Sequence, residues 1–236
     1  VLDSFMELQL RDTGKSRWGN HTPRDIFNLE AILSFYPQAK IITCTRDLRD
    51  FLLSYQGKWR ATSPIEVKRL RKLYHPVITS ILWKSSLRLL PKIRKQVPEH
   101  NLCLVKYEDL VHEPENTVHR ICRTIEEDFK KEMLDVDSYS SSYGAGHKGV
   151  YASSVGRWRE RLKPEEIWVG QRLASKELWD LGYPIEQVSV NLLKVVWIFT
   201  KSPFALWRGL RTNKHKRGPL LPYLDSRIKT MFGSKD

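Results

Sequence analysis

Residues 40–55 read Lys-Ile-Ile-Thr-Cys-Thr-Arg-Asp-Leu-Arg-Asp-Phe-Leu-Leu-Ser-Tyr. The first six residues are mostly apolar or β-branched and follow a break at Pro37, which is typical of a short buried strand. From Asp47 to Trp59 apolar residues recur at helical spacing, at Phe51, Leu52 and Tyr55. A strand, a tight turn and a helix form half of a βαβ unit. This stretch therefore predicts an α/β fold.

The rest of the chain continues the alternation of strands and helices. Residues 102–107 predict a second strand. Three further helices are expected: a long basic one from Pro64 to Arg94, interrupted near Pro76 and Pro91, then helices starting at Pro114 and at Pro164, the last ending at Leu181. Residues 136–155, rich in Ser, Gly and Tyr, predict a loop. Alternating strands and helices imply a parallel sheet flanked by helices, here over residues 1–185, with a helical basic extension over 186–236.

The composition suits an anionic partner. The 236 residues contain 40 Lys and Arg against 27 Asp and Glu, a net charge of +13. A nucleotide, a nucleic acid, an acidic polysaccharide or an anionic membrane would all fit this charge. The three cysteines show no zinc-ligand spacing and are expected to be reduced thiols. We expect no metal, and no apolar run reaches the ~18 residues of a membrane span.

A candidate anion site follows the first strand. Arg46 stands at the carboxyl end of a predicted parallel strand, where α/β folds bind ligands, and its guanidinium matches phosphate oxygens. Ser54 adds a hydroxyl donor, and Lys58 lies one helical turn further on the same face. The alternative is that these are surface groups of an amphipathic helix.

Four segments in register resemble the sulfotransferases that use 3′-phosphoadenosine 5′-phosphosulfate (PAPS), nearest their tyrosylprotein and carbohydrate branches. Arg46 and Ser54 match the spacing of the element that binds the 3′-phosphate. The other segments are Trp18-Gly19-Asn20-His21-Thr22-Pro23, Val105-Lys106-Tyr107-Glu108-Asp109-Leu110, and the pair 154–159 and 181–184.

This resemblance implies a fold like that of P-loop NTPases and a set of site residues. Arg46 and Ser54 would contact the 3′-phosphate of PAPS, with Lys58 as a weaker match. Tyr107 would lie near the nucleotide, and Arg157 would close over its phosphates. Glu108 and Asp109 belong to a structural element of the family, and Trp158 is expected to pack against the core.

His21 occupies a position where branches of the family have a lysine near the bridging oxygen of the sulfate. A cation or donor there lowers the barrier to sulfuryl transfer, by analogy with phosphoryl transfer. Three interpretations stay open: a pH-dependent replacement for the lysine, a mark of reduced activity, or a histidine that either caps a helix or is simply solvated.

The phosphosulfate-binding loop that opens such domains, of the type Pro-x-Ser-Gly-Thr-Thr, has no counterpart in this sequence. We therefore expect the chain to be N-terminally truncated and inactive alone. Gly14-Lys15-Ser16 lacks the earlier glycine and the preceding strand of a phosphate loop, so it predicts a surface turn. The general base cannot be assigned.

The leading hypothesis is a PAPS-dependent sulfotransferase acting on a hydroxyl or amine of a carbohydrate, lipid or protein. The alternatives are a non-catalytic chain that binds PAPS or adenosine 3′,5′-bisphosphate (PAP), and a basic protein that binds a membrane surface or nucleic acid. No RNA-recognition or helix-turn-helix signature supports nucleic acid.

The segment 187–224 has seven Lys and Arg, no acidic residue, and many aromatic and aliphatic residues. It predicts either a helix that packs on the domain with its charges in water or, over 190–217, a helix on a membrane surface. The expected location is cytoplasmic, with membrane association as a further candidate.

Overall fold

The structure is a computed structural model with side chains, and it describes residues 2–22, 25–57, 67, 73–135, 155–212, 219–222 and 225. Three predictions lie outside the described residues: the part of the first helix after residue 57, the helix start at Pro64, and most of the loop over 136–155.

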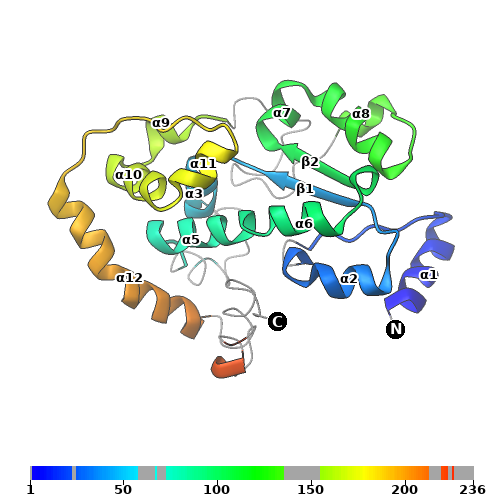
Figure 1. Ribbon diagram of the computed structural model, residues 1–236, viewed down its shortest axis with the longest axis horizontal. Coiled ribbons are helices and arrows are strands. Elements are labelled where there is room, and N and C mark those ends of the chain that lie inside the picture. The colour runs from blue at the N-terminus through cyan, green and yellow to red at the C-terminus, as the bar shows by residue number, and fades with distance from the viewer. Residues whose placement is uncertain are drawn as a thin grey trace.

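Two parallel strands lie at the centre of the fold (Figure 1). β1 (Ile41–Thr45) pairs with β2 (Leu102–Lys106) in a register that runs from Ile41 opposite Leu102 to Thr45 opposite Lys106. Both strands were predicted within one residue of these bounds. The register places their carboxyl ends side by side, and the prediction of an α/β fold with a parallel sheet flanked by helices is confirmed.

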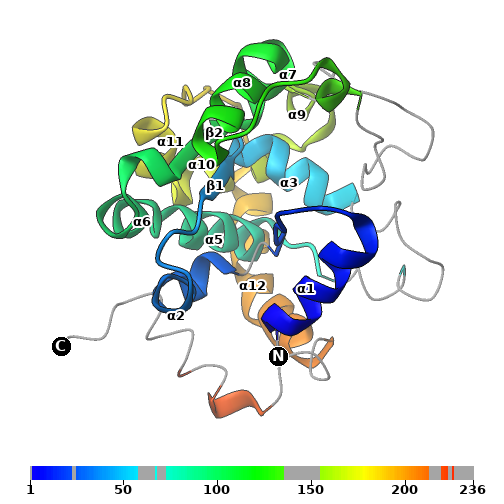
Figure 2. The same ribbon diagram turned by 90° about the vertical axis from the view of Figure 1, so that its right-hand side faces the viewer.

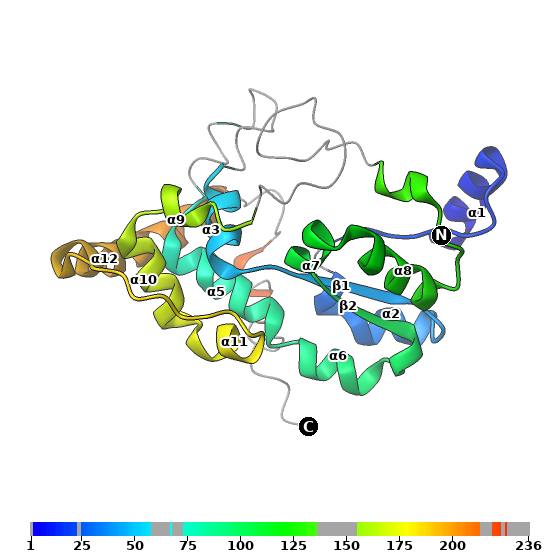
Figure 3. The ribbon, with the colours of Figure 1, turned by 90° about the horizontal axis from the view of Figure 1, so that it is seen from above.

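Helices cover both faces of this sheet (Figures 1 and 3). On one face, α2 (Leu29–Phe35) and α6 (Leu90–Gln96) pack an apolar cluster against Ile41, Leu102 and Leu104. Cys103 and Val105, which alternate with Leu102 and Leu104 along β2, are buried on the opposite face. There α7 (Tyr107–His112) and α8 (Pro114–Ile125) contact β2.

A second layer of helices lies beyond the carboxyl ends of the strands. α3 (Leu48–Gly57) packs against α5 (Pro76–Leu87) and α10 (Pro164–Leu173). Their shared core includes Leu48, Leu52 and Trp83, together with Trp158 of the short helix α9 (Trp158–Arg161). The predicted burial of Trp158 is confirmed. This layer fixes the direction in which α3 leaves the sheet.

The helix expected over Pro164–Leu181 is two helices. α10 ends at Leu173, and α11 (Ser175–Asp180) follows after Ala174, whose φ of −127° lies outside the helical range. The bend brings Ala174 and Leu178 into the core with Trp158. The burial of these side chains outweighs the helical pattern of the sequence. The predicted stop is confirmed, because Gly182 has a φ of +73°, a left-handed conformation that favours glycine.

The remaining elements lie at the edges of the molecule. They are α1 (Leu2–Thr13), the 3₁₀ helices Asp25–Asn28, Glu99–Asn101 and Lys131–Leu134, and the long α12 (Leu192–Thr212). α12 contacts α5 and α10 on the side of the molecule away from the sheet (Figures 1 and 2). No helix within the described residues is long and apolar enough to cross a membrane. The boundary predicted at residue 185 stays a prediction.

Two glycines provide a matched test of this packing. A Cβ at Gly170 in α10 would lie 3.0 Å from Cδ1 of the buried Leu52, whereas a Cβ at Gly209 in α12 would meet nothing within 4 Å. Alanine favours a helix over glycine by about 1 kcal/mol, and crowding a packed core costs about 1–3 kcal/mol. We expect Gly170→Ala to destabilise the protein by about 1 kcal/mol and Gly209→Ala to stabilise it by up to about that amount. Urea denaturation measures both, and equal effects would contradict the close packing of α10 on α3.

Candidate functional site

Arg46 and Tyr107 meet where the two strands end. Each is the residue after its strand, and Thr45 and Lys106 are paired in register, so the two residues are neighbours. The Arg46 Cζ atom lies 4.2 Å from the centroid of the Tyr107 ring, which is the geometry of a cation–π contact. The indole N–H of Trp83 donates to the Arg46 carbonyl at 2.8 Å and fixes the backbone there. The structure thus brings together two of the residues that the sequence singled out.

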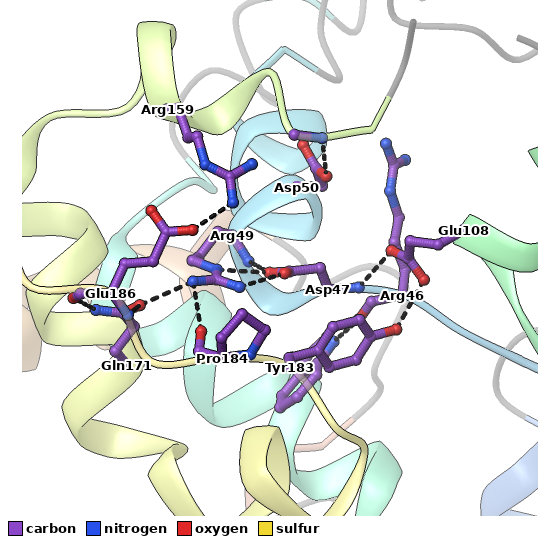
Figure 4. Close-up of polar contacts among 12 residues, drawn as sticks. Arg46, Asp47, Arg49, Asp50, Glu108, Arg159, Gln171, Tyr183, Pro184 and Glu186 are labelled. Carbon is purple, nitrogen blue, oxygen red and sulfur yellow. Dashed lines mark hydrogen bonds and ion pairs between the residues drawn. The ribbon is translucent and has the colours of Figure 1, made fainter. Parts of the chain in front are cut away.

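The Arg46 side chain extends away from the buried contacts beneath it (Figure 4). Asp47, the next residue, points the other way and its carboxylate is buried with Arg49. Successive residues at a strand end can face opposite sides in this manner. The turn therefore presents one arginine to the strand edge and uses the other inside the domain.

Ser54 lies on α3, the helix that starts directly after this turn, and it is half-buried. Its role in binding phosphate stays a prediction, and Lys58 lies outside the described residues.

Arg157 is held near α3 through its neighbour. The Gly156 N–H donates to Asp50 Oδ2 at 2.7 Å, and Gly156 has a φ of +77°, which places the following residues at the start of α9. Asp50 is on the first turn of α3. Burial raises the pKa of Asp50, and the nearby Arg46 charge partly opposes that rise, so the two side chains interact electrostatically. Asp50 thereby connects the Arg46 turn to the segment that carries Arg157.

His21 is exposed in the link between α1 and the first 3₁₀ helix. Its neighbours are ordered by local contacts: the Asn20 amide donates to Asp25 at 2.5 Å, and the Asp25 N–H donates to the Thr22 carbonyl at 2.9 Å. Trp18 packs edge-on against Tyr36, with ring centroids 5.6 Å apart. The link runs alongside the sheet (Figure 3). Within the described part of the chain no contact joins His21 to Arg46.

Gly14-Lys15-Ser16 forms the exposed turn that the sequence predicted. Gly14 has a φ of +63°, and the Lys15 N–H donates to the Leu10 carbonyl at 3.0 Å, which ends α1. This turn follows a helix, unlike a phosphate loop, which follows a strand.

Beneath the site lies a buried ion pair between Arg49 and Asp47 (Figure 4). Arg49 is 1 % exposed. Its Nε and one terminal nitrogen donate to Asp47 at 2.9 and 2.5 Å, and the other terminal nitrogen donates to Gln171 Oε1 and to the Pro184 carbonyl, both at 2.9 Å. The guanidinium also stacks on Trp158, at 4.1 Å from the ring centroid. Arg49 therefore joins the β1–α3 turn to α10, α9 and the chain after α11.

Glu108 makes a second connection across the strand ends. Its Oε1 accepts the Asp47 N–H at 2.9 Å, and its Oε2 accepts the Tyr183 hydroxyl at 2.7 Å. Burial, together with the bond to Glu108, raises the pKa of Tyr183, so this hydroxyl keeps its proton as a donor. These contacts agree with a structural role for Glu108.

Arg49, Glu108 and Tyr183 lie within the sequence motifs, but those motifs predict no role for Arg49. The pattern Asp47-x-Arg49 offered a signal, because a carboxylate two residues before an arginine can pair with it. Nothing in the spacing could reveal that Gln171 and Pro184 complete the shell from 122 and 135 residues away.

Replacing Arg49 should strongly destabilise the folded protein. Arg49→Ala leaves the buried Asp47 carboxylate uncompensated, and removal of one partner of a buried pair costs about 3–5 kcal/mol. The control Lys92→Ala removes an exposed pair with Glu30 and should leave the free energy of unfolding nearly unchanged. Chemical denaturation measures both, and a mild effect of Arg49→Ala would show that the pair is not structurally required.

Asp50 predicts a pH dependence with a definite sign. Burial raises the pKa of Asp50 above its ordinary value of 3.8, against the opposing effects of the Gly156 N–H and Arg46. The folded state then binds the proton more tightly than the unfolded state. Protonated Asp50 therefore makes its whole contribution to the free energy of unfolding below pH 3.8, and this contribution is lost as the pH rises through the pKa of the folded state. We expect the stability difference between the wild type and Asp50→Asn to shift against the wild type over that range. Denaturation of both proteins at a series of pH values tests this, and parallel curves would contradict it.

No group of three or more His, Cys, Asp and Glu within the described ranges is arranged to hold a metal ion. The expectation that the reaction needs no metal stays a prediction.

The model of a sulfotransferase family matches residues 2–131. Among solved structures, the chain is similar to the sulfotransferase domain from the curacin biosynthetic pathway, with 18 % identity and a TM-score of 0.44. That match covers 70 % of this chain and 60 % of the other, so the chain spans about 60 % of the length of that domain. A comparison with curated protein sequences gives no significant match.

The assignment rests on the family match, which extends over more than half of the 236 residues and includes both strands, Arg46, Ser54 and Tyr107. The chain therefore belongs to the sulfotransferase family, whose P-loop-like α/β fold agrees with the parallel sheet and flanking helices described above.

Proposed function

We propose that this chain takes part in sulfuryl transfer from PAPS to a hydroxyl or amine of a carbohydrate, lipid or protein acceptor. The observation that carries the proposal is the contact between Arg46 and Tyr107 at the carboxyl ends of two parallel strands. This is the edge of an α/β sheet at which ligands bind. Family membership supports sulfuryl transfer in general, and the donor and the acceptor are part of the proposal.

Arg46 would bind the 3′-phosphate of the nucleotide. Its guanidinium is planar, so an aromatic ring stacked on its face does not compete for the N–H donors, which lie along its edge. Stacking on Tyr107 also restricts the side chain, so less rotamer entropy is lost when the phosphate binds. Ser54 would add a neutral donor from the second turn of α3.

Arg157 would reach the other phosphates from the segment before α9. Asp50 holds this segment through the Gly156 N–H, and α3 carries both Asp50 and Ser54. A single helix would thus position donors for the two ends of the nucleotide. In this arrangement Asp50 is a positioning residue and Arg157 is a binding residue.

His21 would act near the leaving oxygen, where negative charge develops during transfer. A hydrogen-bond donor or a cation placed there stabilises the transition state more than the ground state. The exposed position of His21 is compatible with a role that requires contact with substrate. Closure of its link over the nucleotide would be needed to bring it to the reacting group.

A second candidate function is nucleotide binding without transfer. The observation that favours it is His21 itself, which stands where branches of the family have lysine and has no described contact with the Arg46 turn. In that case the chain would bind PAP or PAPS through Arg46 and Ser54 alone.

The binding step is tested with PAP. We expect the chain to bind PAP and Arg46→Ala to weaken binding by about 2–3 kcal/mol, roughly 30- to 150-fold, as for a lost charge-assisted contact. The control is Arg172→Ala, which removes an exposed arginine from α10. Titration calorimetry gives both affinities, and equal affinity of Arg46→Ala and the wild type would show that Arg46 does not hold the phosphate.

Transfer is tested separately, with labelled PAPS and a panel of polysaccharide, lipid and tyrosine acceptors, using the full product of the natural gene. Transfer that falls with Arg46→Ala supports the leading proposal. Binding of PAP without transfer to any acceptor supports the second candidate, and failure to bind either nucleotide would overturn both.

A further inference from the structure

α12 exposes its apolar side chains instead of burying them. Val195 and Ala205 are its buried residues, and both are small. The large side chains are exposed, with Leu193 at 81 %, Trp197 at 62 % and Trp207 at 51 %. Leu192, Val196, Phe204 and Leu206 are exposed as well. The sequence left open a helix that packs on the domain, and in the structure Val195, Ile198 and Ala205 make that contact.

The exposed residues form one face of the helix. At 100° per residue, Val195, Ile198 and Ala205 point in one direction, towards the domain. Val196, Phe204 and Trp207 point in the opposite direction, with Leu193 and Trp197 beside them. We call these five residues the outer face of α12. An apolar face of this size is unusual on a protein surface that contacts only water.

Basic side chains border the outer face and lie over its aromatic rings. The Lys201 Nζ atom is 4.2 Å from the Trp197 centroid, and the Arg211 Cζ atom is 5.2 Å from that of Trp207. Arg208 lies 5.9 Å from the Phe204 ring. Phe204 and Trp207 also line a hollow with Arg208, Arg211 and Thr212. Residues 187–224 contain no Asp or Glu, so nothing in that segment balances these charges.

We propose that the outer face of α12 binds the surface of an anionic lipid bilayer. A helix lying in the headgroup region buries apolar and aromatic side chains in the acyl boundary while lysine and arginine reach the lipid phosphates. Tryptophan suits this boundary because one end of its ring is apolar and the other donates a hydrogen bond. The outer face, its basic border and the missing acidic residues match each of these requirements.

A second copy of the chain fits this face less well. Packing two outer faces together would bring Lys201, Arg208 and Arg211 of both copies near one another, with no acidic residue in α12 to pair with them. Like charges oppose such a contact, whereas anionic lipids supply the opposite charge. Charge complementarity therefore selects the membrane as the occupant.

The proposal is independent of the nucleotide site, since α12 contributes none of its residues. α12 packs on α5 and α10, which also hold α3, and so would fix the orientation of the domain relative to the bilayer.

Vesicle co-sedimentation of the intact protein tests the proposal. We expect binding to vesicles of phosphatidylcholine mixed with phosphatidylserine, much weaker binding to phosphatidylcholine alone, and loss of binding at high salt. The double change Trp197→Ser with Trp207→Ser should reduce the partition coefficient more than about 10-fold. Its control is Trp179→Ser, which removes another exposed tryptophan, 78 % exposed, from α11.

The electrostatic part is tested by Lys201→Gln and Arg211→Gln. Each should lower partitioning into anionic vesicles by about 5-fold, the effect of about 1 kcal/mol for each basic residue near the surface. The charge-matched controls are Lys176→Gln and Arg172→Gln, exposed residues on α11 and α10. Circular dichroism on every variant checks that the fold is retained.

Three outcomes would overturn the proposal. The first is no binding to anionic vesicles, and the second is an equal loss of binding in the α12 variants and their controls. The third is that light scattering shows a dimer that the tryptophan substitutions dissociate, while the protein does not bind vesicles. None of these outcomes depends on PAP binding or on transfer, so they leave the proposed function to its own test.

Discussion

The buried pair between Arg49 and Asp47 is the constraint on which much of this structure depends. A guanidinium that is 1 % exposed is tolerated only where nearly every donor has an acceptor, because charges removed from water are costly without compensation. Asp47, Gln171 and the Pro184 carbonyl supply these acceptors, and Trp158 covers the face. All of these segments must be in place together, so the pair makes the folding of the turn, α9, α10 and the chain after α11 cooperative.

The same constraint positions the candidate site. Arg46 and Asp47 are consecutive, so a turn that buries one side chain directs the other to the edge of the sheet. Glu108 holds the Asp47 N–H from the neighbouring strand end, and Trp83 holds the Arg46 carbonyl from α5. The backbone that carries Arg46 is thereby fixed from several sides in the absence of any ligand. Such preorganisation reduces the free energy spent on ordering during binding.

α12 differs from these elements, because it contacts the domain through Val195, Ile198 and Ala205 while most of its large apolar residues face outward. A helix that packed its apolar face against the core would bury its large apolar side chains and expose its polar ones. On the two proposals made above, the molecule would have two separate surfaces with affinity for anions: a strand edge suited to a compact phosphate, and a long face suited to an extended charged layer. Together they would allow a membrane-bound domain to act on a soluble donor.

The sequence by itself determined the two strands, the turn after the first of them, and the convergence of Arg46 and Tyr107 near the strand ends, because local patterns of apolar and β-branched residues specify strands and parallel strands end at one edge. It also identified the family motifs and the basic, aromatic character of residues 187–224. Only the tertiary structure decided that the helix after Pro164 bends at Ala174, that Arg49 is buried and that α12 exposes its aromatic face. Each of these depends on partners distant in the chain, such as Gln171 and Pro184 for Arg49, and local spacing contains no information about which distant groups will supply the compensating contacts.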